Sequence, residues 1–315
     1  MTQPNALEHI QIDTSDEESL FATQSILDSN FSFASSVRDY CYENGRRYHA
    51  YRHGQYPFPN DEEEQDRLAV MHHLFKLVLG GDLYRAPFAR DRPPTRILDI
   101  GTGTGEWAIE ISENFPGAEI IGTDLSPIQP GWVPSNCRFF IDDVESDWAF
   151  TPGEAFDFIH ARTMGWFEVQ EFAMELSSDD GSHHMAPTVM EWLNRVNDAS
   201  KQFGKDLNIA KDVAGWMRKE GYVNVHDDIY KAPVGGWAKN PRMKEIGRMT
   251  RITVNDIIEP YSLALMTRVI GLSYQEVQEY MERVRAEFLN PKVHFHFYFH
   301  FVYGQRPLDD TEAQT

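Results

Sequence analysis

The apolar positions of the chain fall into short runs that alternate with helical patterns. Four runs are too short for buried helices and are typical of strands covered on both faces: 97–100, 119–122, 138–141 and 156–160. Between the first two runs, a helical pattern extends from 106 to 115 and ends at Pro116-Gly117. Strands that alternate with helices indicate an α/β fold with a parallel, doubly wound sheet.

Helical patterns dominate on both sides of these strands. An apolar stripe between Leu68 and Val78 predicts a helix that starts near residue 60 and stops at the glycine pair 80–81. Ser273 and Glu276 have the spacing of a capping box, which begins a helix that runs to about residue 289. Other elements are predicted downstream of the strands: helices at 187–203, 206–219 and 242–270, and strands at 222–230 and 293–303.

These patterns divide the chain into segments of different character. The N-terminal part is acidic, contains neither Lys nor Arg, and is expected to be flexible. The helices after the strands are expected to form a lid over the sheet. The predicted segments are an acidic stretch (1–34), a helical lead-in (35–92), an α/β core (93–176), a helical lid with the closing strands (177–307) and a short tail (308–315).

Composition narrows the class of protein. The 315 residues are 41% hydrophobic and 13% aromatic, which is enough for a substantial core. The net charge of −20 repels a phosphate backbone and argues against nucleic-acid binding. A local basic cluster is interpreted most simply as a solvated face: Arg46, Arg47, Arg52 and His53.

Cysteine content and hydropathy bear on the compartment. Cys41 and Cys137 are too few for a disulfide framework, which favours a reducing, cytoplasmic or nuclear setting. The N-terminus lacks the pattern of a signal peptide. The chain also lacks an apolar stretch of the ~18 residues needed to span a membrane, so we expect no membrane association.

The run ILDIGTGTGEWAIE carries the clearest chemistry. The first strand leads through Asp99 into three alternate glycines, and a helix follows at once: Gly101, Gly103 and Gly105. Glycines let the backbone approach a ligand closely, and the helix start offers free N–H groups. Dinucleotides favour G-x-G-x-x-G, whereas an acid beside G-x-G-x-G suits the cationic cofactor S-adenosylmethionine. A tight turn without a ligand is the alternative.

Two further strand ends carry acids. Asp124 follows the second strand and is placed to accept both hydroxyls of a ribose. Asp143 follows the third strand and is placed to accept from an adenine amino group, with Val144 against the ring. The alternative for Asp143 is a loop acid beside Asp142. Carboxyl ends of parallel strands form the crevice where such sheets bind ligands.

The chain resembles a known family, the fungal methyltransferases called LaeA-like. Members of this family share the class I (Rossmann-like) methyltransferase fold. The resemblance spans about residues 35–307 and rests on NGRRYHAYRHGQYPFPNDEEEQDRL, the glycine run with its continuation to GWVP, FDFIHARTM and VYGQRP. It implies S-adenosylmethionine as cofactor. By position it assigns Asp99, Gly101, Gly103 and Gly105 to the methionine end, Asp124 and Leu125 to the ribose, and Asp143 and Val144 to the adenine.

One segment departs from the family pattern. FDFIHARTM is followed directly by GWFEVQEF, although parallel neighbouring strands need a crossover, usually a helix. Roughly 20–30 residues are therefore missing between the fourth and fifth strands. This gap predicts the loss of the crossover helix. Three explanations stay open. The chain comes from a shortened transcript variant, or the two segments form a hairpin or a single long strand and lose the normal strand order, or the site is truncated and inactive.

The candidate catalytic residues lie at the end of the fourth strand. His160 is the predicted general base for a hydroxyl acceptor, and Arg162 is predicted to orient the substrate. Alternatively, His160 packs inside the sheet and Arg162 pairs with an acid. Glu171 is a second candidate base. From the lead-in, Tyr48 and Tyr56 are predicted to pack over the sulfonium, or else to cap the core.

The last strand is rich in histidine. His294, His296 and His300 share one face and four phenylalanines share the other. A metal site needs three or four ligands in a fitting geometry, and no Cys or acid joins them in the sequence. We therefore interpret this strand as buried, with its histidines hydrogen-bonded, and predict no metal.

These observations lead to two functional hypotheses. The first is an S-adenosylmethionine-dependent enzyme that methylates a small molecule, expected from the resemblance to belong to fungal secondary metabolism. The alternative is a LaeA-like regulator with weak or absent catalysis that acts through protein partners. The acidic charge and the aromatic residues of the helical part fit an apolar, neutral or cationic acceptor, whereas the missing crossover favours the second hypothesis.

Overall fold

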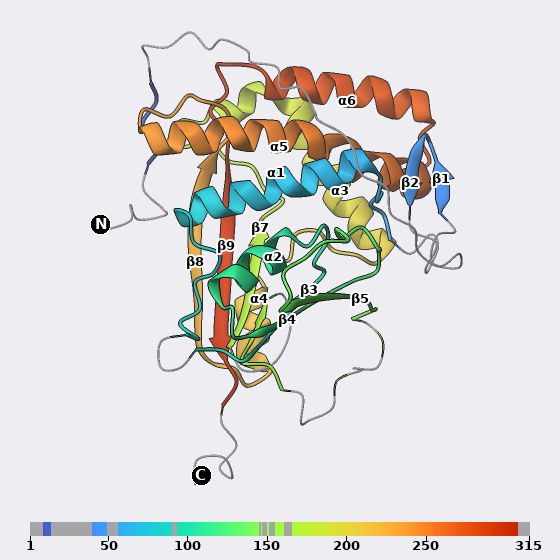
Figure 1. The fold of residues 1–315 in the computed structure, drawn as a ribbon. Coiled ribbons are helices and arrows are strands. Elements are labelled where there is room, and N and C mark those ends of the chain that lie inside the picture. Colours follow the sequence, from blue (N-terminus) through green and yellow to red (C-terminus); the bar gives the residue numbers. More distant parts are fainter. Residues whose placement is uncertain are drawn as a thin grey trace.

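The computed structural model describes residues 9–13, 40–48, 56–89, 93–144, 146, 150, 155–160 and 166–307 of the chain. A helical layer lies against one end of a large sheet (Figure 1). A small hairpin of β1 (Cys41–Glu43) and β2 (Arg46–Tyr48) stands beside the helical layer.

The large sheet has seven strands in the order β5-β4-β3-β6-β7-β9-β8. Strands β3 to β7 are parallel, whereas β9 runs antiparallel to both of its neighbours. The predicted α/β fold with a doubly wound, mostly parallel sheet is confirmed. The strands are β3 (Arg96–Ile100), β4 (Glu119–Asp124), β5 (Cys137–Ile141), β6 (Phe158–His160), β7 (Trp166–Phe172), β8 (Val223–Pro233) and β9 (His296–Gln305).

The connection between β6 and β7 is short, yet the strand order is normal. The two strands are parallel, with Phe158 opposite Trp166 and His160 opposite Glu168. The connection consists of residues 161–165, outside the described residues, and is too short for a crossover helix, as predicted. Because β6 has three residues, the chain returns only about 7 Å along the strand, which a five-residue link can span. A hairpin or a single long strand is excluded.

The two faces of the sheet are covered by different helices. On the α2 face, helix α2 (Glu106–Asn114) packs over Ile97, Ile120 and Phe158. The opposite, α4 face carries Leu98 and Ile159, and Phe167 lies in register with them. Helix α4 (Val213–Lys219) packs on Phe167 through Val213 and Met217. Alternation along each strand separates the two sets of side chains.

The helical layer encloses the largest core. Figure 1 shows α1, α5 and α6 lying across the end of the sheet, and α3 joins them in one apolar cluster with β9. Fully buried Trp192 donates its indole N–H to the Ser262 hydroxyl at 2.7 Å. The helices of this layer are α1 (Glu62–Leu79), α3 (Pro187–Phe203), α5 (Pro241–Leu265) and α6 (Tyr274–Phe288), with a 3-10 turn, η2 (Ser182–Met185), and a π-helical turn, η3 (Met266–Ile270).

Most predicted element boundaries agree with the structure, but one helix is wrong. Helix α3 has the predicted bounds, and both hydrogen bonds of the Ser273–Glu276 capping box are present. The helix predicted at 206–219 begins only at Val213. The Asp206 carboxylate accepts the backbone N–H of Asn208 at 2.9 Å, which forms a local turn in place of a helical start.

The basic cluster also needs correction, because Arg46 does not lie on a solvated face. Its side chain is 7% exposed and binds the carboxylates of Asp61 on α1 and Glu259 on α5. Arg47 binds Glu62, while Arg52 and His53 fall outside the described residues. In the structure, the arginines of this lead-in therefore form ion pairs that connect β2 to the helical layer.

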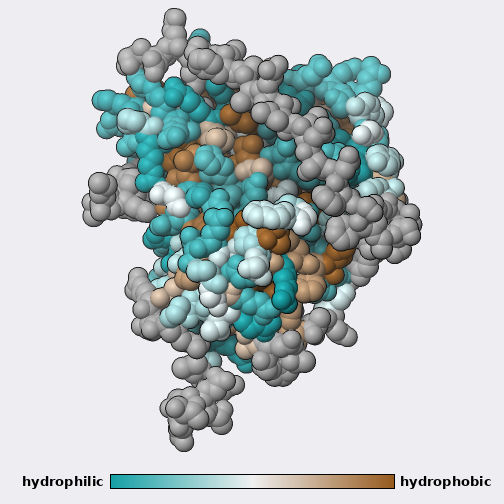
Figure 2. Space-filling view, in the orientation of Figure 1, coloured by the Kyte–Doolittle hydropathy of each residue, from teal (hydrophilic) through white to brown (hydrophobic). Residues whose placement is uncertain are grey.

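The surface is mostly polar. Hydrophilic residues dominate the face in Figure 2, and apolar residues appear in its central part. Within the described part of the chain, none of the helices is long and apolar enough to cross a membrane. At the N-terminal side, residues 9–13 pair with the loop before α5 through a bridge between Ile12 and Ala238.

Candidate functional site

The carboxyl ends of three central strands place ionisable groups side by side on the α2 face. Asp99 of β3 lies opposite His160 of β6, which lies opposite Glu168 of β7. Glu168 is fully buried and accepts the backbone N–H groups of Arg85 and Ala86 at 2.7 and 2.6 Å. It therefore fixes the segment after α1 to the sheet, and burial raises its pKa.

The glycine turn after β3 has the predicted strand–turn–helix form. Gly101, Gly103 and Gly105 all have positive φ, and α2 begins directly after Gly105. A Cβ at Gly101 would meet no described atom within 4 Å, whereas a Cβ at Gly105 would overlap the ring of Phe139. Gly101 thus leaves space for a ligand, and Gly105 is required by packing against β5.

A pocket of about 350 Å³ lies between this turn, α1 and the ends of β6 and β7. It brings together five of the predicted residues: Asp99, Gly101, Gly103, His160 and Glu171. The other lining residues were not predicted from the sequence as site residues: Arg67, Leu68, Met71, His72, Phe75, Thr102, Thr104, Glu106, Trp107, Gln170, Phe172 and Tyr261.

Within this pocket, His160 and Asp99 form a hydrogen-bonded pair. His160 Nδ1 lies 2.7 Å from Asp99 Oδ1, and the Thr102 hydroxyl donates to Asp99 Oδ2 at 2.5 Å. The imidazole stacks on Trp107, with 3.9 Å between ring centroids and an interplanar angle of 5°. Among the described residues, His160 Nε2 has no hydrogen-bond partner although it is shielded from solvent. A neutral His160 that donates from Nδ1 therefore keeps an acceptor at Nε2.

Asp124 supports the glycine turn. Its two carboxylate oxygens accept the backbone N–H groups of Gly103 at 2.8 Å and Ser126 at 2.9 Å. Burial raises the pKa of Asp124, and these hydrogen bonds oppose that rise. The backbone N–H of Leu125 also donates to this carboxylate, so of about four acceptor positions roughly one remains for a hydroxyl group. Asp124 itself is not among the residues that line the pocket. Leu125 beside it is half-buried.

The other predicted cofactor residues lie away from the lining of the pocket. Asp143 is buried and accepts from the Ser146 hydroxyl at 3.2 Å, and Val144 is 39% exposed. Tyr48 is buried beneath the guanidinium of Arg268 on η3, 5.3 Å from its ring centroid. Arg162 falls outside the described residues.

Tyr56 lies nearer the pocket. Its ring meets Phe58 edge-on at 5.6 Å, and Phe58 packs on the pocket residue Tyr261 at 4.7 Å. The pKa of Tyr56 is raised by desolvation and, secondly, by the carboxylate of Asp124. Tyr56 itself is not among the residues that line the pocket.

Arg67 is the most informative residue that the sequence did not single out. It is 7% exposed, and its Nε and Nη2 donate to Glu64 at 2.9 and 2.5 Å. Among the described residues, Nη1 makes no further hydrogen bond. The sequence signal was an Arg directly beside the apolar stripe of the first helix, paired with an acid three residues earlier.

The donor set fits S-adenosylmethionine. Asp99, Glu106 and Glu171 supply negative charge that suits a sulfonium and an ammonium group, and the positive charge of Arg67 is balanced by Glu64. The free Nη1 of Arg67 suits the cofactor's carboxylate. The open space over Gly101 leaves room for the methionyl group beside the turn, and Asp124, just outside the lining, supports the turn through the N–H of Gly103.

The histidines of the last strand are individually hydrogen-bonded. His294 contacts Asp180 at 2.7 Å, His300 contacts Asp227 at 3.0 Å, and His296 contacts the Tyr298 hydroxyl at 3.3 Å. The described residues hold no group of three or more His, Cys, Asp or Glu arranged to bind a metal ion.

Comparison with known proteins agrees with this geometry. Residues 70–168 match a methyltransferase domain family. Methyltransferase pytC of Aspergillus terreus is 37% identical over 88% of this chain and 91% of its own length. The secondary metabolism regulator LAE1 of Cochliobolus heterostrophus is 31% identical over 84% and 94%. The protein-methionine methyltransferase laeA of Emericella nidulans is 30% identical over 84% and 76%.

The fold, the glycine turn and these relatives lead to one assignment. The relatives match nearly the whole chain, including the helical layer, so the similarity is not confined to the cofactor-binding strands. The cofactor of this chain is S-adenosylmethionine. The chain belongs to the LaeA-like family of fungal methyltransferases.

Proposed function

We propose that the pocket methylates a small-molecule acceptor in fungal secondary metabolism, with His160 as general base. One observation supports this most strongly: the glycine turn and the Asp99–His160 pair line the same pocket. A cofactor-binding turn and a hydrogen-bonded base within one cavity are the two parts that methylation of a hydroxyl group requires.

The residues of the turn and of α1 bind and orient the cofactor. When bound, S-adenosylmethionine supplies a methyl group on a positively charged sulfur, which passes to the acceptor by in-line displacement. Arg67 would bind the carboxylate inside the pocket. The ribose would extend past the lining to Asp124 and Leu125, and the adenine to Asp143 and Val144. Positioning of this kind accounts for most of the rate of a displacement reaction.

His160 takes the proton of the acceptor. Asp99 accepts from Nδ1 and so keeps Nε2 as the basic atom, and the stacked indole of Trp107 holds the imidazole plane in place. Nε2 would take up the proton of the acceptor hydroxyl. Arg162 follows two residues later and orients the substrate.

The pocket's apolar residues favour a small acceptor. Met71, Phe75 and Phe172 line the pocket and help to exclude water from the reaction. The volume of about 350 Å³ has to hold the cofactor as well, which leaves little room for a bulky acceptor. The chain's net charge of −20 favours neutral or cationic acceptors over nucleic acid.

A second candidate is a regulator that acts with protein partners, including partners in the nucleus. The names of the LAE1 and laeA relatives favour it, and the name of laeA adds a methionine side chain of a protein as acceptor. The main reason to expect a loss of catalysis was the short β6–β7 connection, which could have disturbed the strand order or the site. Because strand order and the Asp99–His160 pair survive this shortening, the enzyme remains the better candidate.

A transfer assay with methyl-labelled S-adenosylmethionine separates these candidates. Fungal extract is fractionated into small molecules and proteins, and label is counted in each fraction after incubation with the parent protein and with His160→Asn. We expect label among small molecules and a roughly 10²–10⁴-fold lower rate for the variant, with S-adenosylhomocysteine affinity retained. Label in proteins alone, or none despite cofactor binding, would favour the regulator.

A further inference from the structure

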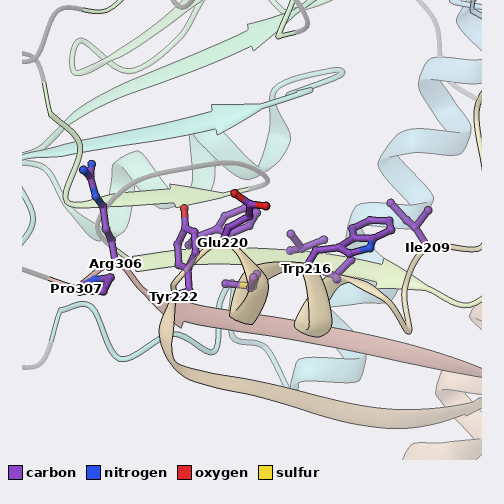
Figure 3. A pocket seen from close by; sticks show the side chains of 10 residues that line it. Ile209, Trp216, Glu220, Tyr222, Arg306 and Pro307 are labelled. Carbon is purple, nitrogen blue, oxygen red and sulfur yellow. The ribbon is translucent and has the colours of Figure 1, made fainter.

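A second, mostly apolar groove lies on the opposite side of β7 from the cofactor pocket. It encloses about 480 Å³ between β7 and α4. In Figure 3, Arg306, Pro307 and Tyr222 stand at one end, and Trp216 and Ile209 stand toward the other. We call it the α4 groove, lined by Phe167, Val169, Ile209, Val213, Trp216, Met217, Glu220, Tyr222, Arg306 and Pro307.

The handedness of strand connections shows what this position normally contains. The connection from β3 to β4 carries α2 on the α2 face, as a right-handed crossover requires. In the sheet, β4 lies on one side of β3, whereas β7 lies on the opposite side of β6. A right-handed crossover from β6 to β7 therefore belongs on the α4 face. The connection from β7 to β8 runs in the same direction, and its helix α4 does pack on that face.

The groove therefore coincides with the place of the absent crossover helix. Phe167 lies in register with Ile159 on the α4 face, and Val169 follows on the same side of β7. Only residues 161–165 connect β6 to β7, too few to place a helix there. Helix α4 covers Phe167 from one side, and Trp216 at its edge remains 50% exposed.

We propose that the α4 groove binds an amphipathic helix of another protein, which takes the place of the crossover helix. The apolar walls suit side chains spaced at i, i+3, i+4 and i+7 along one face of that helix. Glu220 and Arg306 both line the groove and balance one another, so the preference for a basic polar face rests on the net charge of −20 of the whole chain. This inference goes beyond the methyl transfer proposed above and does not depend on it.

A designed peptide tests the groove directly. The probe is a labelled peptide of about 18 residues of Leu, Ala and Lys, patterned so that all leucines share one helical face. The control peptide has the same composition with the leucines spread around the helix. By fluorescence anisotropy, we expect the patterned peptide to bind at least roughly tenfold more tightly. Equal affinity of the two peptides would overturn the proposal.

Matched variants locate the binding. Trp216→Glu places a charge at the edge of the groove and is expected to weaken binding of the patterned peptide roughly tenfold or more. Trp132→Glu changes a tryptophan that is 87% exposed elsewhere, and is expected to leave affinity unchanged. Calorimetry with S-adenosylhomocysteine checks that both variants keep the cofactor site, which separates loss of the groove from loss of the proposed function.

Three results would assign the groove otherwise and so contradict the proposal. One is unchanged peptide affinity in Trp216→Glu. Another is binding of the apolar dye 1-anilinonaphthalene-8-sulfonate, abolished by Trp216→Glu, without binding of the patterned peptide, which would make the groove a small-molecule site. The third is a dimer of the parent that Trp216→Glu dissociates, which would give the groove to a second copy of this chain.

Discussion

At the scale of single residues, the glycines of the turn have separate roles. Gly101 and Gly105 both adopt positive φ, at 67° and 83°. The space beside Gly101 is open, whereas the ring of Phe139 fills the space beside Gly105. The sequence pattern treats the two glycines alike, but ligand approach explains one and packing explains the other.

We therefore predict opposite phenotypes for two alanine variants. Gly105→Ala adds steric overlap to backbone strain and should lower the free energy of unfolding by roughly 2–5 kcal/mol, with cofactor affinity little changed in the folded fraction. Gly101→Ala should lower the free energy of unfolding by about 1–2 kcal/mol but weaken the binding of S-adenosylhomocysteine roughly tenfold or more. Urea unfolding and calorimetry measure the two effects. Equal affinity losses in both variants would contradict this division.

The Glu64–Arg67 pair gives a second contrast at this scale. Its side chains are only 4% and 8% exposed. Arg67→Met leaves a buried carboxylate without its partner and should destabilise the fold by about 3–5 kcal/mol. The double variant Glu64→Gln with Arg67→Met should restore much of that stability while cofactor affinity stays low. Urea unfolding tests this, and a double variant no more stable than Arg67→Met would argue against it.

Residues close in sequence were the easiest to predict. Asp99 and the glycine turn lie within seven positions, so their spacing alone indicated the strand–turn–helix form. The partnership of His160 with Asp99 depends on the pairing of β3 with β6, which local sequence does not encode. Arg67, Trp107 and Tyr261 reach the pocket from three different helices, and only tertiary packing brings them together.

At the scale of elements, local signals succeeded where a cap or a breaker was present. The α6 capping box and the left-handed Gly80 that ends α1 follow from short-range chemistry. The start of α4 was wrong because a side-chain turn at Asp206 competes with the helix. The start of α1 depends on Asp61, which caps Glu64 and also binds Arg46 of β2.

Asp61 therefore supports both a helix and a tertiary contact. Asp61→Ala loses the cap and breaks the pair with Arg46, so we expect a loss of roughly 3 kcal/mol in unfolding free energy. Asp61→Asn keeps the cap and should lose less. Chemical denaturation of the three proteins at neutral pH measures these differences, and an unchanged stability in Asp61→Ala would refute the bridging role.

The same carboxylate predicts a pH effect. Burial opposes its ionisation, but the hydrogen bonds from Arg46 and from the backbone of Arg47 and Glu64 outweigh burial and lower the pKa of Asp61. A folded-state pKa below the unfolded value stabilises the fold above the unfolded pKa of about 4, and this contribution is lost as the pH falls further. The advantage of the parent over Asp61→Asn should shrink below about pH 4.

At the scale of the whole molecule, the sheet keeps its order although one crossover is missing. The three-residue length of β6 makes the short return feasible, and the handedness of the remaining connections keeps each helix on its own face. The sequence predicted the missing helix from the crossover requirement. It did not predict that the strands would remain parallel, because that depends on how far the chain must travel back.

We propose that the glycine turn and its flanking carboxylates bind S-adenosylmethionine in this shortened fold. Calorimetric titration with S-adenosylhomocysteine tests this proposal, using the parent protein, Asp124→Ala and a control on the surface of α6, Tyr274→Ala, at a residue that is 48% exposed. We predict one binding site per chain and an affinity for S-adenosylhomocysteine that is lower by roughly tenfold or more in Asp124→Ala. The control should bind as tightly as the parent. Absence of binding to the parent, or equal affinity in Asp124→Ala, would contradict the claim.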